Sequence, residues 1–105
     1  MEFAEYDQNH CDIVESGINA IISYYNSRDH EEKRSILLCL DRYLDPYYQY
    51  DLPYKNQIFE WLQNEFENTQ DPKIKEDIFD LIDYYSEIRI PNYERDDNGD
   101  LVQIN

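Results

Sequence analysis

The chain has 105 residues, with 24 Asp and Glu against 9 Lys and Arg, so its formal net charge is −15. A chain this acidic is not expected to bind nucleic acid or an anionic membrane surface, because both are bound through Lys and Arg. The length predicts one domain, residues 1–105. Apolar and aromatic residues make up 41% of the chain and glycine occurs only twice, which favours a folded helical protein over a β-sandwich or barrel.

Two amphipathic segments occupy the first half of the chain. The first covers about residues 9–26 and carries on one helical face Val14, Ile18, Ile21, Ile22 and Tyr25. The second covers about residues 29–45. Asp29 and Glu32 resemble a capping box at its start, and Pro46 requires it to end near residue 45.

Two further segments occupy the second half, at about residues 53–67 and 71–87. Pro53 and Pro72 suit the first position of a helix, and Asp71 is a natural N-cap. Their apolar stripes are Tyr54, Ile58, Trp61, Leu62 and Phe66, then Ile74, Ile78, Leu81, Ile82 and Tyr85. Because the connections are short, we expect an all-α fold of four amphipathic antiparallel helices, arranged as two helix hairpins.

A weak internal repeat has two interpretations. A shift of 40 residues superposes Val14 and Ile18 on Tyr54 and Ile58. The repeat indicates either a HEAT-like pair of helix hairpins or only the fact that amphipathic helices align once one is shifted.

The C-terminal segment, residues 91–105, is polar and breaks the helical pattern. It predicts either a tail or a short β-hairpin between residues 87–90 and 101–104, because Asn98-Gly99 is a strong turn signal.

The sequence contains no catalytic or metal-binding pattern. Cys11 and Cys39 are expected to be free thiols, and His10 and His30 surface imidazoles, since their spacing matches no zinc site. A calcium loop over residues 94–105 would lack its final Glu, which favours an ordinary acidic turn. We therefore expect no enzyme, no cofactor and no metal.

Two surface features remain. A stripe of one sign follows the predicted fourth helix at helical spacing, formed by Glu76, Asp80, Asp83 and Glu87. Because such charges repel each other, the stripe indicates either a cationic partner or only a need for solubility.

The second feature is a central loop that interleaves tyrosine with carboxylates and is stiffened by Pro46 and Pro53. Its candidate anchors for a protein partner are Asp45, Tyr47, Tyr48, Tyr50 and Asp51. Alternatively, Tyr43 and either Tyr47 or Tyr48 cap the core.

The N-terminal sequence MEFAEYDQ has no basic region and no apolar run, so we expect no signal peptide and a cytoplasmic location. No apolar stretch is long enough to span a membrane.

In its small size, acidity, tyrosine content and expected helical fold, the chain resembles bacterial immunity proteins of contact-dependent inhibition and related polymorphic toxin systems. The resemblance covers the whole chain in character and rests on no single motif. It implies a cognate toxin domain as partner, of the nuclease type with a basic cleft. Two other classes stay open: a DNA-mimic inhibitor of phage or mobile-element origin, and a structural helical adaptor or dimerisation module.

Overall fold

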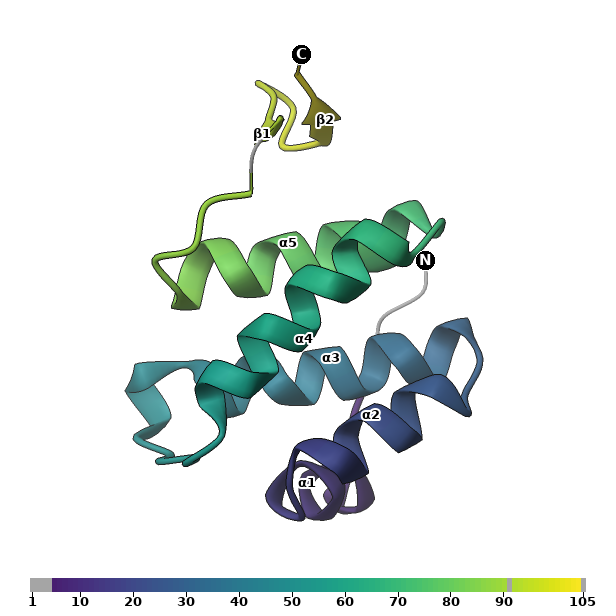
Figure 1. The fold of residues 1–105 in the computed structure, drawn as a ribbon, viewed down its shortest axis with the longest axis vertical. Helices are drawn as coiled ribbons and strands as arrows, with labels where there is room; N and C mark the ends of the chain where they lie inside the picture. The colour runs from purple at the N-terminus through teal and green to yellow at the C-terminus, as the bar shows by residue number, and fades with distance from the viewer. Residues whose placement is uncertain (1–4, 91, 105) are drawn as a thin grey trace.

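The structure is a computed structural model that describes residues 5–90 and 92–104 (Figure 1). This part of the chain contains five α-helices, one short 3-10 helix and two strands. Their bounds are α1 Gln8–Glu15, α2 Ile18–Asn26, α3 His30–Leu44, η1 Pro46–Tyr48, α4 Lys55–Asn68, α5 Pro72–Tyr85, β1 Tyr93–Arg95 and β2 Leu101–Gln103. The chain is therefore mostly helical, as expected, with a small antiparallel sheet.

The first predicted helix is two helices, so the prediction of four helices is wrong. Gly17 separates α1 from α2 with a φ of 117°, a conformation that side chains disfavour. The apolar spacing continues across this residue, although the backbone leaves the helix there. The break falls within the segment that the 40-residue shift superposes on the unbroken α4, which leaves the HEAT-like repeat without a matching first helix.

The predicted starts of α3 and α5 are confirmed. The Asp71 side chain accepts hydrogen bonds from the backbone N–H groups of Lys73 and Ile74, at 2.9 and 3.3 Å. Asp29 accepts one from Glu32 N at 3.0 Å. These carboxylates satisfy N–H groups that have no partner within the helix, which fixes where each helix begins.

Two helix ends differ from the prediction. α4 begins at Lys55 and has no side-chain cap, so Pro53 precedes the helix and does not open it. α5 ends at Tyr85, where Ser86 adopts an extended conformation and its hydroxyl bonds back to Ile82 O at 2.7 Å. Glu87 therefore lies beyond the helix.

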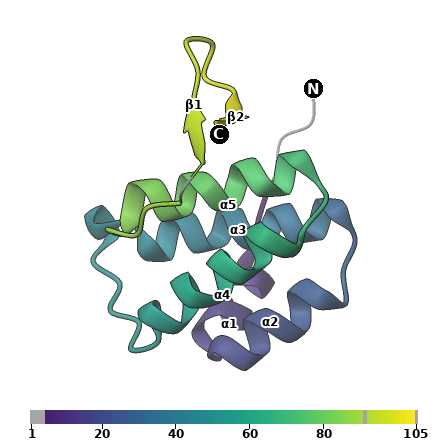
Figure 2. The same ribbon diagram turned by 45° about the horizontal axis from the view of Figure 1, so that its top comes forward.

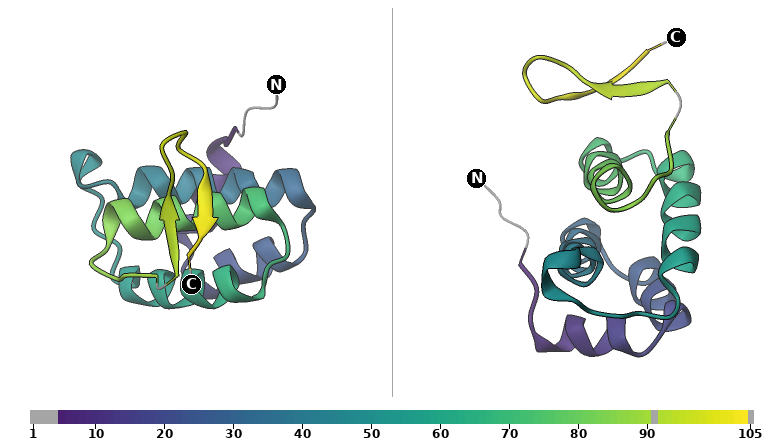
Figure 3. Two further views of the ribbon diagram at one scale, coloured as in Figure 1. Left: turned by 90° about the horizontal axis from the view of Figure 1, so that it is seen from above. Right: turned by 90° about the vertical axis from the view of Figure 1, so that its left-hand side faces the viewer.

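The helices form layers around α3. Viewed along α3 and α5 in Figure 3, the hairpin, α5, α3 and the α1/α2 pair follow one another, and α4 runs across their side. α3 contacts α1, α2 and α5, and α4 packs against α5 (Figure 2). A ring contact between Trp61 and Tyr25, with centroids 5.0 Å apart, connects α4 to α2.

The core is built from apolar side chains of all five helices. Its buried side chains are Val14, Ile21, Tyr25, Ile36, Leu37, Cys39, Leu40, Tyr43, Leu44, Ile58, Phe59, Trp61, Leu62, Phe66, Ile74, Ile78, Phe79, Leu81 and Ile82. Ile18, Ile22, Tyr54 and Tyr85, which belong to the predicted stripes, are only partly buried. The stripes therefore predicted most of the core.

The C-terminal segment forms the β-hairpin and not a frayed tail, but with a different first strand. Tyr93, Glu94 and Arg95 pair with Gln103, Val102 and Leu101. The strand that pairs with residues 101–103 is thus 93–95, and the prediction of 87–90 is wrong. Gly99 closes the turn with a φ of 83°, which a glycine adopts without strain.

Candidate protein-binding surface

The central loop presents two tyrosines to solvent. The Asp45 carboxylate accepts a hydrogen bond from Tyr47 N at 2.9 Å, Pro46 opens the 3-10 helix η1, and Gln49 closes it with a φ of 59°. Tyr47 is 82% exposed and Tyr48 is 48% exposed. Their rings meet edge to face with centroids 5.2 Å apart. The turn therefore holds both rings on the surface.

Tyr50 belongs to the edge of the core. It is partly buried, and its ring lies 4.3 Å from that of Tyr43, measured between centroids. The expectation that Tyr47 or Tyr48 shares this role with Tyr43 is wrong, because the turn directs those rings outward and the chain comes back to the core at Tyr50. Asp51, the last predicted anchor of the loop, is exposed.

The predicted acidic stripe divides into two halves. Glu76 and Asp80, in α5, both form ion pairs with Arg95 of β1. Asp83 and Glu87 are exposed, and within residues 5–90 and 92–104 neither has an ion-pair partner. Only the second half of the stripe presents unpaired carboxylates to solvent.

Burial changes the electrostatics of the first half. It raises the pKa of Asp80 above its usual range, although the neighbouring Arg95 acts in the opposite direction. A third carboxylate of α5, Asp77, accepts hydrogen bonds from Arg34 of α3, with Nε 2.7 Å and Nη2 3.3 Å from its oxygens. Internal arginines therefore balance much of the charge in the first three turns of α5.

The C-terminal ends of α3 and α5 lie on the same side of the molecule (Figure 1). The Tyr85 hydroxyl of α5 donates a hydrogen bond of 2.5 Å to the Asp41 carboxylate of α3. Burial of the Tyr85 side chain and its hydrogen bond to Asp41 raise the pKa of Tyr85. The contact brings the last turn of α5, with the 68% exposed Tyr84, to the same end as the central loop.

We call this end of the molecule the tyrosine-acid end, defined by Asp45, Tyr47, Tyr48, Asp83, Tyr84 and Glu87. The C-termini of α3 and α5 lie at this end (Figure 1), and a helix C-terminus carries a partial negative charge. The last turn of α3 holds Arg42, 5.2 Å from the Tyr48 ring, but the last turn of α5 has no basic residue, and carboxylates such as Asp83 and Glu87 are unfavourable there, where Lys or Arg would be stabilising. The electrostatics of this end therefore suit a cationic ligand.

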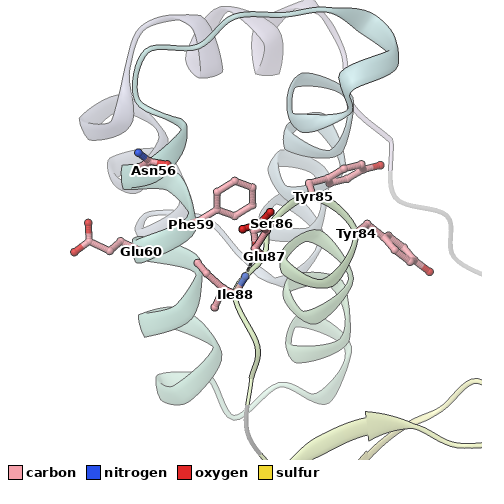
Figure 4. A pocket seen from close by; sticks show the side chains of 8 residues that line it. All are labelled: Asn56, Phe59, Glu60, Tyr84, Tyr85, Ser86, Glu87 and Ile88. Carbon is pink, nitrogen blue, oxygen red and sulfur yellow. Dashed lines mark hydrogen bonds between the residues drawn. The ribbon is translucent and has the colours of Figure 1, made fainter.

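A hollow of about 690 Å³ lies next to this end, between α4 and residues 86–88. Figure 4 shows Phe59 pointing from α4 towards these residues and Ile88 pointing back towards α4. Glu60 and Glu87 also line the hollow, and among the described residues that line it there is no Lys or Arg. The hollow continues the acidic character of the surface over an apolar floor.

A buried histidine is the feature that the sequence analysis missed. His10 was expected at the surface but is 6% exposed, with Nδ1 3.0 Å from Asp7 N and Nε2 3.1 Å from the Glu32 carboxylate. Burial, and then the hydrogen bond to Glu32, raise the pKa of Tyr24 to about 12. The Tyr24 hydroxyl of α2 lies 3.2 Å from the same Nε2 and donates to Glu32, so His10 joins α1 to α2 and α3. Its position three residues after the capping Asp7 was the available signal.

The thiols lie close to each other. Cys39 is buried, and its Sγ lies 3.9 Å from that of Cys11, which is partly exposed. Burial raises the pKa of the Cys39 thiol, which makes it a poor nucleophile. In the part of the chain that the structure describes, no three His, Cys, Asp or Glu side chains gather as metal ligands. None of the described helices combines the length and apolar character needed to cross a bilayer.

Comparison of the chain with models of protein families, with curated proteins and with solved structures finds no match.

Proposed function

We propose that this protein is an inhibitor of the immunity type, which binds and neutralises a bacterial toxin domain that has a basic cleft. One observation carries the proposal. At the tyrosine-acid end, the exposed rings of Tyr47 and Tyr84 accompany the exposed carboxylates of Asp83 and Glu87, beside two helix C-termini.

The physical basis of the inhibition is charge complementarity. A nuclease toxin needs Lys and Arg around its cleft to hold phosphate, and carboxylates with aromatic anchors can occupy the same cleft. Tyrosine gives a large contact area at a small cost in conformational entropy. The net charge of −15 also attracts a basic partner over a distance, which raises association rates towards about 10⁸–10⁹ M⁻¹s⁻¹ at low salt.

The test begins with capture of the partner from the native host and continues with the two purified proteins. A charge-reversed double variant, Asp83→Lys with Glu87→Lys, is compared with a matched control, Glu67→Lys with Asp97→Lys. All four side chains are exposed, and two reversals change the net charge of −15 by +4, so both variants carry −11. The measurements are inhibition of the toxin's activity and the association rate constant at several salt concentrations.

We expect the Asp83/Glu87 variant to associate at least about tenfold more slowly than the control at low salt, with the difference shrinking as salt rises. Tyr47→Ala should mainly accelerate dissociation, because it removes contact area and no charge. Equal inhibition by both double variants would contradict the proposed surface. A captured partner that is a restriction or similar host enzyme would instead favour the DNA-mimic class.

A further inference from the structure

Arg95 reaches from the hairpin into a three-sided site on α5. Its Nη1 lies 3.3 Å from the Glu76 carboxylate, and its Nη2 donates a hydrogen bond to Asp80. Between these two carboxylates, its guanidinium carbon lies 5.5 Å from the centroid of the Phe79 ring. Two carboxylates and an aromatic face match the two ways in which a guanidinium group binds, by its planar fork and by stacking.

The hairpin that supplies Arg95 is attached lightly. In Figure 3 it lies beyond α5, on the side away from α3. Besides Arg95, the hairpin contacts the helices through the Tyr93 ring, 4.8 Å from that of Phe66 and 5.5 Å from Lys75 Nζ, and through Leu101, which is partly buried against the core. All fully buried apolar residues of the described chain are in the helices. A two-stranded hairpin has little stability of its own, so its place on α5 depends on these contacts, and its departure would uncover Phe66 and Phe79 but remove no fully buried residue from the core.

A cation between Glu76 and Asp80 is favourable whether or not the hairpin supplies it. Glu76 and Asp80 are spaced i, i+4 on one helix face, and like charges at this spacing repel each other. If the hairpin moves away, both carboxylates flank the Phe79 ring without a counter-charge. The bound side chain of Arg95 therefore indicates that this part of α5 accepts a guanidinium group.

We propose that Glu76, Phe79 and Asp80 form an arginine-binding site, which Arg95 fills within the chain and which an arginine of a basic protein partner takes over. The proposal rests on the proposed function only for the identity of the partner. In this proposal, the first half of the acidic stripe belongs to a site that Arg95 covers in the isolated protein. The tyrosine-acid end, in contrast, is exposed to solvent in the isolated protein.

The internal arginine must lower the affinity for an external one, because the partner binds only the fraction of molecules in which the site is open. Removing Arg95 removes this competition. Arginine is favoured over lysine, since an ammonium group cannot bridge two carboxylates and stack on a ring at once.

The experiment uses the full chain and a blocked Gly-Arg-Gly peptide as the probe, with a blocked Gly-Lys-Gly peptide for comparison. Arg95→Ala is compared with Arg89→Ala, which loses the same charge from an exposed residue outside the site. Binding is followed by NMR through the backbone amides of Glu76, Phe79 and Asp80.

We expect Arg95→Ala to bind the arginine peptide about fivefold or more tightly than Arg89→Ala, with the shifts centred on α5. The lysine peptide should bind more weakly, and Asp80→Asn added to Arg95→Ala should remove the gain. Equal affinities for Arg95→Ala and Arg89→Ala, or shifts centred elsewhere, would overturn the proposal.

If circular dichroism shows that Arg95→Ala loses helical structure, the proposal is tested on the wild-type protein with the arginine peptide. The arginine peptide should then displace the hairpin and shift the amides of Tyr93 and Leu101, and absence of that effect refutes the site. Because no toxin is used, these results stand apart from the neutralisation test: either proposal can fail while the other holds.

Discussion

Replacing Asp71 with Ala removes two contacts that fix the start of α5. The cap bonds to Lys73 N and Ile74 N contribute about 1 kcal/mol. The second contact joins Asp71 to His30 Nδ1 at the start of α3, where the two side chains are 29% and 39% exposed. Such a partly exposed contact adds at most about 1 kcal/mol. We expect the free energy of unfolding to fall by about 2 kcal/mol in total.

Two further variants separate the contributions. Asp29→Ala removes a cap with a single bond, to Glu32 N at 3.0 Å, and should cost about 1 kcal/mol. Asp71→Asn keeps an oxygen for the cap and removes the charge that faces His30, so it should cost about 1 kcal/mol or less.

Urea unfolding at neutral pH, followed by the fluorescence of the single tryptophan, Trp61, and by far-ultraviolet circular dichroism, measures these differences. The slope m should stay unchanged, and 2 kcal/mol corresponds to a fall in the melting temperature of about 8–16 °C. Equal losses for Asp71→Ala and Asp29→Ala would show that the His30 contact contributes nothing. A loss for Asp71→Asn as large as for Asp71→Ala would refute the cap.

Three further outcomes follow from burial and charge. Burial alone would raise the pKa of Asp71, but the hydrogen bonds from His30, Ile74 and Lys73 lower this pKa overall. The stabilisation that the Asp71 carboxylate provides is therefore present above its unfolded-state pKa of about 3.9 and is lost as the pH falls below it. The stability difference between wild type and Asp71→Asn should shrink as urea unfolding is repeated from pH 6 down to about pH 3. Iodoacetamide should modify Cys11 well before Cys39, because Cys39 is buried and its thiol pKa is raised; mass spectrometry of peptides checks the order, and equal rates would contradict the packing. Ile78→Ala, at a fully buried site, should cost about 2–5 kcal/mol in the same urea assay, against about 0.5 kcal/mol or less for Tyr84→Ala, whose side chain is exposed.

Local chemistry made α3 and α5 predictable. Asp29 and the Asp71-Pro72 pair predict where each helix begins, and the apolar spacing that follows predicts which helix face is buried. The break at Gly17 could not be found in this way. One glycine costs a helix only about 1 kcal/mol, so whether the chain bends there depends on how α1 packs on α3.

The candidate surface was predictable only where it is local. The sequence Asp45-Pro46 indicated a turn, and the turn exposes Tyr47. Tyr50 could not be distinguished from it, because burial against Tyr43 is decided by the path of the chain after the turn. Arg95 lies 15 residues from Asp80 and outside any periodic segment, so no local pattern connects the two.

We expect the exposed half of the acidic stripe to lower the stability of the isolated protein, and this expectation distinguishes a binding role from a role in solubility alone. Asp83 lies in the last turn of α5 and Glu87 just beyond it, where cations would be favourable by about 0.3–1 kcal/mol each. Asp83→Lys with Glu87→Lys should therefore raise the free energy of unfolding, measured by urea at low salt, while it slows association with a basic partner. A surface that serves solubility alone would gain stability without any loss of binding. Opposite signs in the two measurements are expected only if the carboxylates face a cationic partner.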